Sequence, residues 1–301
     1  MEEFVQEPKS SDPLLQQLVG ERRQEVEGLQ QREAARIKDL NDRGSRKLKS
    51  LQDSLGEQFG DALKEAQTSD AEEAKKTKSR VEKQKEELVA AGRSVERLDE
   101  HPGFVYSNLA APLTSGWITP YYATLHGSNG AIWWQGYNPG NFDLGDWASG
   151  GGSGLFGTGA ASFTTYLDWW FYFRPDSTHF YGHNIYVPFY GFYIIYADDG
   201  FWDSKEAAAR IDLSARGYQY NYKPQSTNSL FNVDSQNINV NDRFDGWRTM
   251  YYGDLLAGGD TAYLLVSASF YVYARGGGSH AEWDFSSGAA NYVGVPWVYW
   301  S

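Results

Sequence analysis

Apolar residues recur every eleven positions through the first part of the chain. Eleven residues make about three α-helical turns of roughly 3.67 residues each, so side chains at this spacing lie on one face of a helix. Asp12 and Pro13 precede them, as an N-cap and a first helical residue do. The pattern predicts one helix over residues 12–66 with two apolar rows: Leu15, Val26, Ile37, Leu48 and Phe59, and Leu18, Leu29, Leu40, Leu51 and Ala62.

The apolar stripe of this hendecad repeat, residues 15–66, is narrow, and the other positions are densely charged. Such a helix buries too little apolar surface to be stable alone, and a narrow stripe favours contact with another helix over contact with lipid. We therefore expect oligomerisation through the apolar rows, as a trimer or a higher assembly. The residues concerned are Leu15, Leu18, Val26, Leu29, Ile37, Leu40, Leu48, Leu51 and Phe59.

A second helical segment begins where the spacing changes. Ser69 and Glu72 match the capping box that begins many helices, and a heptad-like alternation follows over residues 74–98. The second helix either folds back on the first or continues it past a hinge, and the sequence leaves both arrangements open. The helical, coiled-coil-like segment is expected over 12–100, with a linker at 101–104.

The rest of the chain is rich in aromatic residues and poor in charge. All 11 Trp and all 21 Tyr follow residue 100. Aromatic and β-branched runs are bounded by Gly, Pro, Asn or Asp, which is typical of strands. We expect a short helix at 204–210, and strands at 116–125, 130–137, 162–174, 184–197, 210–222, 229–240, 247–252, 261–274, 279–285 and 292–300.

These patterns predict a chain with α and β structure in separate segments. An N-terminal arm at 1–11 and long coiled-coil-like helices precede an all-β, jelly-roll-like sandwich over 105–301. In the run 184–197 aromatic residues alternate onto both faces, which is typical of a central strand or of an oligomer interface.

Charge and residue content exclude several classes of function. The formal charge of −12 argues against sequence-independent nucleic-acid binding, because that binding relies on Lys and Arg. The absence of cysteine excludes disulfides, thiolate metal sites and cysteine catalysis. No apolar run is long enough to predict a transmembrane helix. The acidic N-terminus lacks a Sec-type signal, so we expect a cytoplasmic protein, one released or exported by another route, or part of a virion or particle.

Glu282 and Asp284 are the candidate catalytic residues. They lie two positions apart in a predicted strand, which places both carboxyl groups on one face together with His280. The pair resembles the start of the E-x-D-x-x-E motif of laminarinase-like β-glucanases, in which the first Glu is the nucleophile and the last is the acid/base. Here the last position is Ser287, so the acid/base is missing, and we expect no enzymatic activity.

Acidic loop residues and two histidines are candidate metal ligands. His179 and His183 have a spacing found in metal sites, without an evident third ligand. Carboxylates in loops can hold Ca²⁺, although most such acids form turns without a metal. Calcium is the one cofactor considered, and its candidate ligands are Asp143, Asp146, Asp242 and Asp245.

Tryptophans near polar loop residues are candidate sugar-binding groups. A flat ring stacks on the apolar face of a sugar, and amides or carboxylates bind its hydroxyls. Most of the 11 Trp are expected in the core or in interfaces, with one or two exposed in a site. The candidates are Trp133, Trp134, Trp147, Trp202 and Trp247.

The sequence supports three classes of function. We favour a non-enzymatic, self-assembling structural protein, in which helical stalks bundle and β heads pack or present a binding surface. The layout resembles stalk-and-head proteins such as tail-fibre or adhesin-like molecules. The alternatives are a lectin-like or receptor-binding head that binds glycans on an oligomeric stalk, and a polysaccharide-active enzyme.

Overall fold

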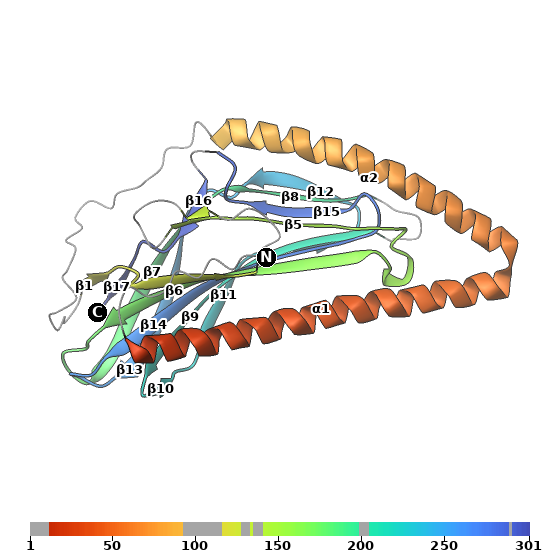
Figure 1. Ribbon diagram of the computed structural model, residues 1–301. Coiled ribbons are helices and arrows are strands. Elements are labelled where there is room, and N and C mark those ends of the chain that lie inside the picture. Colours follow the sequence, from red (N-terminus) through yellow and green to blue (C-terminus); the bar gives the residue numbers. More distant parts are fainter. Residues whose placement is uncertain (1–11, 93–115, 128–132, 135–140, 199–204, 289–290) are drawn as a thin grey trace.

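The computed structural model describes residues 12–92, 116–127, 133–134, 141–198, 205–288 and 291–301. The expected fold class, long N-terminal helices followed by an all-β sandwich of antiparallel strands, is confirmed (Figure 1). No helix among these residues is both long and apolar enough to span a membrane. The sequence predictions that lie outside the described residues are the arm 1–11, the linker 101–104, Trp202, and the end of the heptad pattern beyond Gly92.

The helical segment is a hairpin with its turn at Gly56. Helix α1 spans Pro13–Leu55, and Oδ1 of its N-cap Asp12 accepts hydrogen bonds from the first amide groups. Helix α2 spans Glu57–Gly92 and folds back, which decides between the two arrangements that the sequence left open (Figure 1). The expected helix end near residue 66 was wrong, because the chain turns where Gly56 adopts a φ of 74°, and the expected capping box lies inside α2.

The strands of the described residues form three antiparallel sheets. In the β14 sheet the order is β10 (Asn221–Tyr222), β9 (Glu206–Gln219), β14 (Ala262–Arg275), β6 (Ala160–Phe173) and β2 (Tyr122–His126), with β11 (Ser226–Ser235) also paired to β9. In the β8 sheet it is β12 (Ile238–Arg243), β8 (Phe192–Ala197), β15 (His280–Asp284) and β5 (Gly145–Ser149).

The third, the β7 sheet, completes the sandwich. Its order is β1 (Gly116–Ile118), β17 (Trp297–Trp300), β7 (His179–Tyr190), β16 (Tyr292–Gly294), β4 (Asn141–Asp143) and β3 (Trp133–Trp134), with β13 (Gly246–Leu256) also paired to β7. A short 3-10 helix, η1 (Leu155–Gly157), precedes β6.

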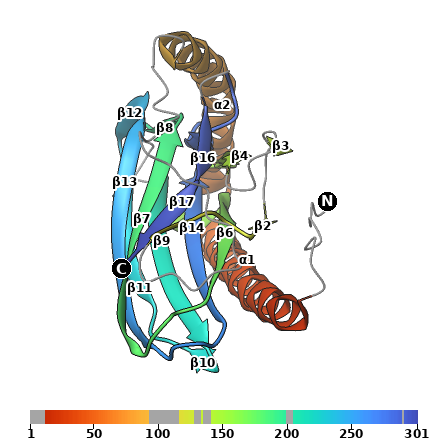
Figure 2. The same cartoon turned by 90° about the vertical axis from the view of Figure 1, so that its left-hand side faces the viewer.

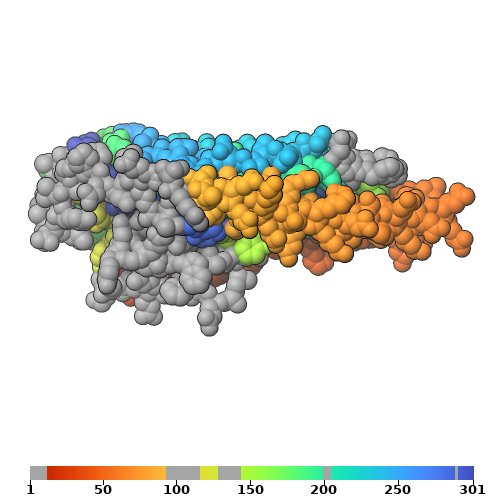
Figure 3. Space-filling view, turned by 90° about the horizontal axis from the view of Figure 1, so that it is seen from above, coloured from red at the N-terminus to blue at the C-terminus, as the bar shows by residue number. Residues whose placement is uncertain are grey.

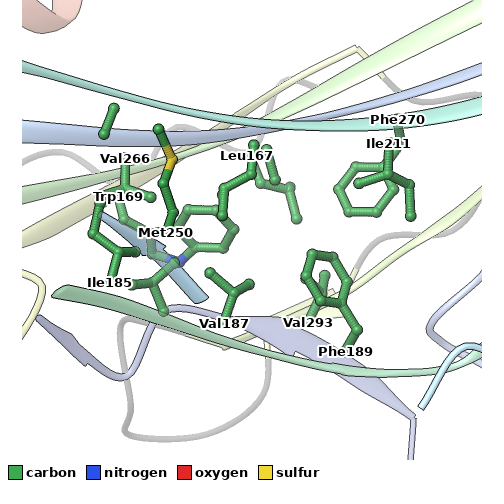
Figure 4. Packing of buried hydrophobic residues seen from close by; sticks show 14 of the residues in the cluster. Leu167, Trp169, Ile185, Val187, Phe189, Ile211, Met250, Val266, Phe270 and Val293 are labelled. Atoms are coloured by element: carbon green, nitrogen blue, oxygen red, sulfur yellow. The ribbon is translucent and has the colours of Figure 1, made fainter. Parts of the chain in front are cut away.

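One apolar core joins the inward faces of all three sheets. Alternate residues of each strand point inward, so Leu167, Val266 and Phe270 of the β14 sheet face Val187 and Phe189 of the β7 sheet (Figure 4). The β8 sheet adds the inward residues of β8 and β15, including Trp283. This burial of large apolar side chains accounts for the stability of the β domain.

The run 184–197, expected to be one strand, passes from one sheet to another at Gly191. Tyr190 ends β7 and Phe192 begins β8. A Cβ at Gly191 would lie 2.3 Å from the ring of Phe285 and 2.6 Å from the carbonyl oxygen of Asp284, so only glycine fits this corner. The run 184–197 carries aromatic residues on both faces because its two strands belong to two sheets, which have different neighbours.

The short helix expected at 204–210 was wrong. Residues 206–210 open strand β9, which pairs with β11 on one side and with β14 on the other. The alanines of this segment have a high helix propensity, but tertiary packing overrides it. Ala207 and Ala209 are fully buried in the core, and Ala208 lies under α1.

Helix α1 packs along the outer face of the β14 sheet. Leu15 and Leu18 contact a cluster formed by Tyr122, Trp170, Tyr263 and Leu265. Further along, Ile37 and Leu40 pack against the cluster of Ala160, Ala208 and Tyr273. The two apolar rows of the hendecad repeat therefore follow the sheet for most of the length of α1 (Figure 1).

Polar contacts fix the register of α1 on this sheet. The guanidinium of Arg22 donates to both carboxylate oxygens of Asp168, at 2.9 and 3.2 Å, and to Oγ of Ser267 at 2.9 Å. The side-chain amide of Asn41 bonds both backbone groups of Ala160. Because the Arg22–Asp168 pair is buried on both sides, it specifies one position of the helix.

Helix α2 packs on the β8 sheet instead. Val81 and Leu88 contact the outward side chains Phe192 and Ile194 of β8. The guanidinium of Arg80 lies 4.4 Å from the ring centroid of Tyr196. The two helices thus cover different sheets, and the β domain lies between them (Figures 1 and 2).

Two helix glycines are expected to respond oppositely to alanine. A Cβ at Gly44 would lie 2.6 Å from the carbonyl oxygen of Phe156, whereas a Cβ at Gly20 meets no atom within 4 Å. Gly44→Ala should lower the free energy of unfolding by about 1–2 kcal/mol through overpacking, and Gly20→Ala should raise it by about 0.5–1 kcal/mol through helix propensity. Urea unfolding measures both. Equal stabilisation by the two substitutions would contradict the close packing of α1.

Candidate functional site

A cleft of about 480 Å³ lies between α2 and the edge of the β8 sheet formed by β5 and β15. Its walls are one face of α2 and the outward residues of the two strands. Figure 3 shows α2 lying along the β domain, with its first turns projecting past it. The residues that line the cleft are Ala74, Thr77, Lys78, Val81, Glu82, Lys85, Trp147, Ser149, Gly150, Gly278, Ser279, His280 and Glu282.

Trp147 supplies an aromatic surface at this cleft. It lies on β5 directly opposite Glu282 of β15, and its side chain is 40% exposed. Strand alternation turns Asp146 and Ala148 into the interior and leaves Trp147 and Ser149 outward. Of the five tryptophans predicted to bind a ligand, Trp147 lines this cleft.

A hydrogen-bonded chain of three polar side chains runs beside Trp147. Oγ of Ser149 lies 3.0 Å from Nδ1 of His280, and Nε2 of His280 lies 3.1 Å from Oε2 of Glu282. If the imidazole carries its proton on Nε2, it donates to Glu282 and accepts from Ser149, so one neutral tautomer satisfies the whole chain. The cleft therefore presents ordered donors and acceptors next to an aromatic ring.

Lys85 of α2 closes the other end of this polar row. Its ammonium group lies 2.7 Å from Oε1 of Glu282 and 2.6 Å from Oδ2 of Asp284. Burial lowers the pKa of Lys85, but the two carboxylates outweigh it and the pKa is raised. Burial raises the pKa of Asp284, yet Lys85 and hydrogen bonds from Ser287 and Ser286 lower it below its usual value.

Asp284 is poorly suited to act as the proton donor of a glycosidase. A glycosidase needs one carboxyl group that is protonated and donates to the leaving oxygen, but Asp284 is held ionised by Lys85 and by two serines. The order hydroxyl, imidazole, carboxylate is also that of a serine triad. Here, however, Lys85 already shares the charge of Glu282, so the row serves better for hydrogen bonding than for activating Ser149.

The candidate calcium ligands whose side chains are described do not converge. Asp146 is fully buried on the inward face of β5, and Asp245 accepts hydrogen bonds from Arg243 and from the amide of Gly191. Asp242 accepts one from the amide of Arg243, and only the backbone of Asp143 is described. Within the part of the chain that the structure describes, no group of three His, Asp or Glu residues is placed to hold a metal ion.

The two candidate histidines have different surroundings. His179 is exposed, its ring centroid lies 3.8 Å from that of Tyr181, and Nδ1 is 2.9 Å from Oγ of Ser177. His183 is buried between the rings of Phe173 and Tyr252, and this burial lowers its pKa to about 3. The pair therefore does not form a common site.

Trp247 lies on the outer face of the β7 sheet, away from the cleft. Its ring centroid is 5.1 Å from that of Trp297, and Trp117 packs against Trp297 and Tyr299 nearby. On the same face, near the middle of β13, Tyr251 is 58% exposed. For Trp133 and Trp134 the description covers the backbone of β3, which pairs with β4.

The residues expected to mediate oligomerisation divide into two groups. Leu15, Leu18 and Val26 are fully buried within the chain, and Ile37 and Leu40 pack on the sheet. The apolar spacing predicted contacts between helices of different copies for these residues, but Leu15, Leu18, Ile37 and Leu40 pack on the chain's own β14 sheet. Towards the turn at Gly56 the same rows continue beyond this sheet (Figure 1).

Ser149 and Lys85 are site residues that were not predicted from the sequence. Ser149 and His280 are 131 positions apart in the sequence, and they meet through the pairing of β5 with β15. Lys85 reaches the same face from a helix 197 residues away from Glu282. The face of Glu282 was readable from strand alternation, but its neighbours depend on tertiary packing that a local pattern does not contain.

No family model and no curated protein matches the chain. Among solved structures it is similar to TmCBM61 in complex with β-1,4-galactotriose, at 8% identity over 57% of this chain and 88% of that chain, with a TM-score of 0.23. It is also similar to the Arthrobacter globiformis T6 isomalto-dextranase complexed with panose (10% identity, 59% and 23% coverage, TM-score 0.18). A third is the enzymatically active domain of bacteriophage CBA120 tailspike protein 4 (7% identity, 60% and 19% coverage, TM-score 0.16). At these TM-scores the similarities support no conclusion about function.

Proposed function

We propose that this protein binds a carbohydrate in the cleft between α2, β5 and β15. The observation that supports the proposal is the exposed ring of Trp147 beside the hydrogen-bonded row of Ser149, His280 and Glu282. A sugar stacks its apolar face on such a ring and exchanges hydrogen bonds between its hydroxyls and the neighbouring polar groups. The cleft volume of about 480 Å³ suits a ligand of one to a few sugar rings.

Substitution of Trp147 tests this proposal. Trp147→Ala removes the stacking surface and should weaken binding of the best ligand from an oligosaccharide array by about tenfold or more, while Trp147→Phe should retain part of the affinity. Isothermal titration measures each change. The matched control is Tyr251→Ala, an exposed aromatic residue on the β7 sheet.

The two substitutions also distinguish two surfaces. Loss of binding in Trp147→Ala alone supports the cleft. Loss in Tyr251→Ala alone would place the sugar on the outer face of the β7 sheet, where Trp247 lies, and would overturn the assignment of the cleft. Absence of binding to any sugar on the array would count against carbohydrate recognition.

Self-assembly is the second candidate function. The favouring observation is the tip of the helical hairpin, defined as residues 45–66, which projects past the β domain (Figures 1 and 3). Leu55 at this tip is 59% exposed, and Leu48, Leu51, Phe59 and Leu63 are partly exposed. A structural protein that associates through this tip would keep the β domain free to bind a ligand.

A further inference from the structure

The hairpin tip combines apolar residues with a division of charge between its two arms. Over residues 45–55 the arm of α1 carries three basic residues, Arg46, Lys47 and Lys49, and one acid, Asp53. Over residues 57–66 the arm of α2 carries three acids, Glu57, Asp61 and Glu65, and one base, Lys64. The two arms of one tip are therefore opposite in sign.

The apolar side chains of the tip continue the eleven-residue apolar row that the β14 sheet covers elsewhere in α1. Leu48 and Phe59 continue the row of Leu15 and Val26 at the same spacing of eleven residues. The β14 sheet covers this row along most of α1, whereas at the tip none of the strands that the structure describes lies beside it (Figure 1). Beyond the end of the sheet, the apolar row therefore needs another surface against which it can be buried.

We propose that two copies of this chain pair through their tips about a two-fold axis, with the basic arm of each against the acidic arm of the other. This inference rests on self-assembly as the second candidate function and names its surface and partner. A second copy fits because a two-fold axis brings each patch against the same surface of the partner, which here is complementary in charge to itself. The apolar residues, with Leu55 at the centre, form the buried middle of the contact.

Sedimentation equilibrium on the full chain across a hundredfold concentration range tests the pairing. Leu55→Asp should raise the dimer dissociation constant by about tenfold or more, because it puts a charge in the apolar middle of the contact. Leu255→Asp is the matched control, since Leu255 is equally exposed, at 58%, but lies on β13. It should leave the dissociation constant unchanged.

Charge reversal tests the pairing through restored association and not only through its loss. Arg46→Glu with Lys49→Glu makes both arms acidic, and Glu57→Lys with Asp61→Lys makes both arms basic. Each double variant alone should be monomeric, and an equimolar mixture should form a heterodimer, because both contacts of the pair then join opposite charges.

The outcomes of these experiments distinguish a failure of the tip interface from a failure of self-assembly. A wild-type chain that stays monomeric at every concentration would overturn both self-assembly and the tip interface. A wild-type oligomer that Leu55→Asp does not weaken, and variants that do not rescue each other, would overturn the tip interface while self-assembly stands.

Discussion

Replacing Arg22 with leucine is expected to lower the free energy of unfolding by about 3–5 kcal/mol. Arg22 binds Asp168 through two hydrogen bonds, and both side chains are removed from solvent between α1 and the β14 sheet. The substitution leaves the carboxylate of Asp168 buried without its counter-charge. Urea unfolding followed by tryptophan fluorescence measures the loss, because all the tryptophans lie in the β half.

Arg23→Leu is the matched control for this substitution. Arg23 is the next residue of α1, is substantially exposed, and pairs with Glu27 along the helix surface. Its removal should change stability by less than about 0.5 kcal/mol. In Arg22→Leu with Asp168→Leu, most of the loss should be recovered, because no unpaired charge remains. A similar small effect of Arg22→Leu and Arg23→Leu would contradict the buried position of the pair.

The second large effect is expected from Lys85→Met, which removes the cation between Glu282 and Asp284. Both carboxylates are buried, but Lys85 itself is 36% exposed and solvent screens part of its interaction. We therefore expect a loss of about 2–3 kcal/mol, below the roughly 3–5 kcal/mol of a fully buried pair. Helix α2 should detach from the β8 sheet more readily, and the cleft should lose one wall.

The loss should depend on pH in a defined direction. In the wild type the lowered pKa of Asp284 gives stability that is present above its unfolded pKa of about 3.9 and lost as pH falls through the folded value. The raised pKa of Lys85 gives stability that is present below about 10.4 and lost as pH rises through its folded value. Between about pH 5 and 9 this contribution is constant.

In Lys85→Met the two carboxylates share a buried face without a cation, so protonation of one relieves the repulsion. The difference in free energy of unfolding between wild type and variant should therefore be largest near pH 8 and shrink towards pH 5. Lys83→Met, an exposed neighbour on α2 that lies 3.8 Å from Glu87, is the control and should show neither effect. A difference that grows on acidification would contradict the proposed ion pairs.

The local patterns of the sequence were sufficient to predict the helical half, the β half and most of the helices and strands. Asp12 and Pro13 begin α1 where the pattern placed them, and strand alternation put His280, Glu282 and Asp284 on one face of β15. The eleven-residue spacing also identified the buried side of α1. These features depend on neighbours in the sequence, which periodicity records.

What covers the apolar rows could not be read from the sequence. Leu15 and Leu18 meet Trp170 and Tyr263, and a stripe that fits a partner helix fits the face of a sheet equally well. The turn at Gly56 was missed because the apolar spacing runs through it in phase, from Leu51 to Ala62. The strand formed by the alanines of β9 could not be predicted for the same reason. Their burial in the core outweighs their helix propensity.

The packing of the helical hairpin on its own β domain, which forms the cleft, can be tested by disulfide cross-linking. A Cβ at Gly277 would lie 2.8 Å from Cβ of Asp70 in α2, within about 1 Å of the separation of roughly 3.5–4.5 Å found in disulfides. The chain has no cysteine, so Asp70→Cys with Gly277→Cys introduces one defined pair. Oxidation of the dilute double variant should give a cross-link within one chain, and a mixture of the two single variants should give no dimer that joins them. Cross-linked dimers from that mixture would show that α2 packs on another copy, and would contradict the hairpin and the cleft that it forms.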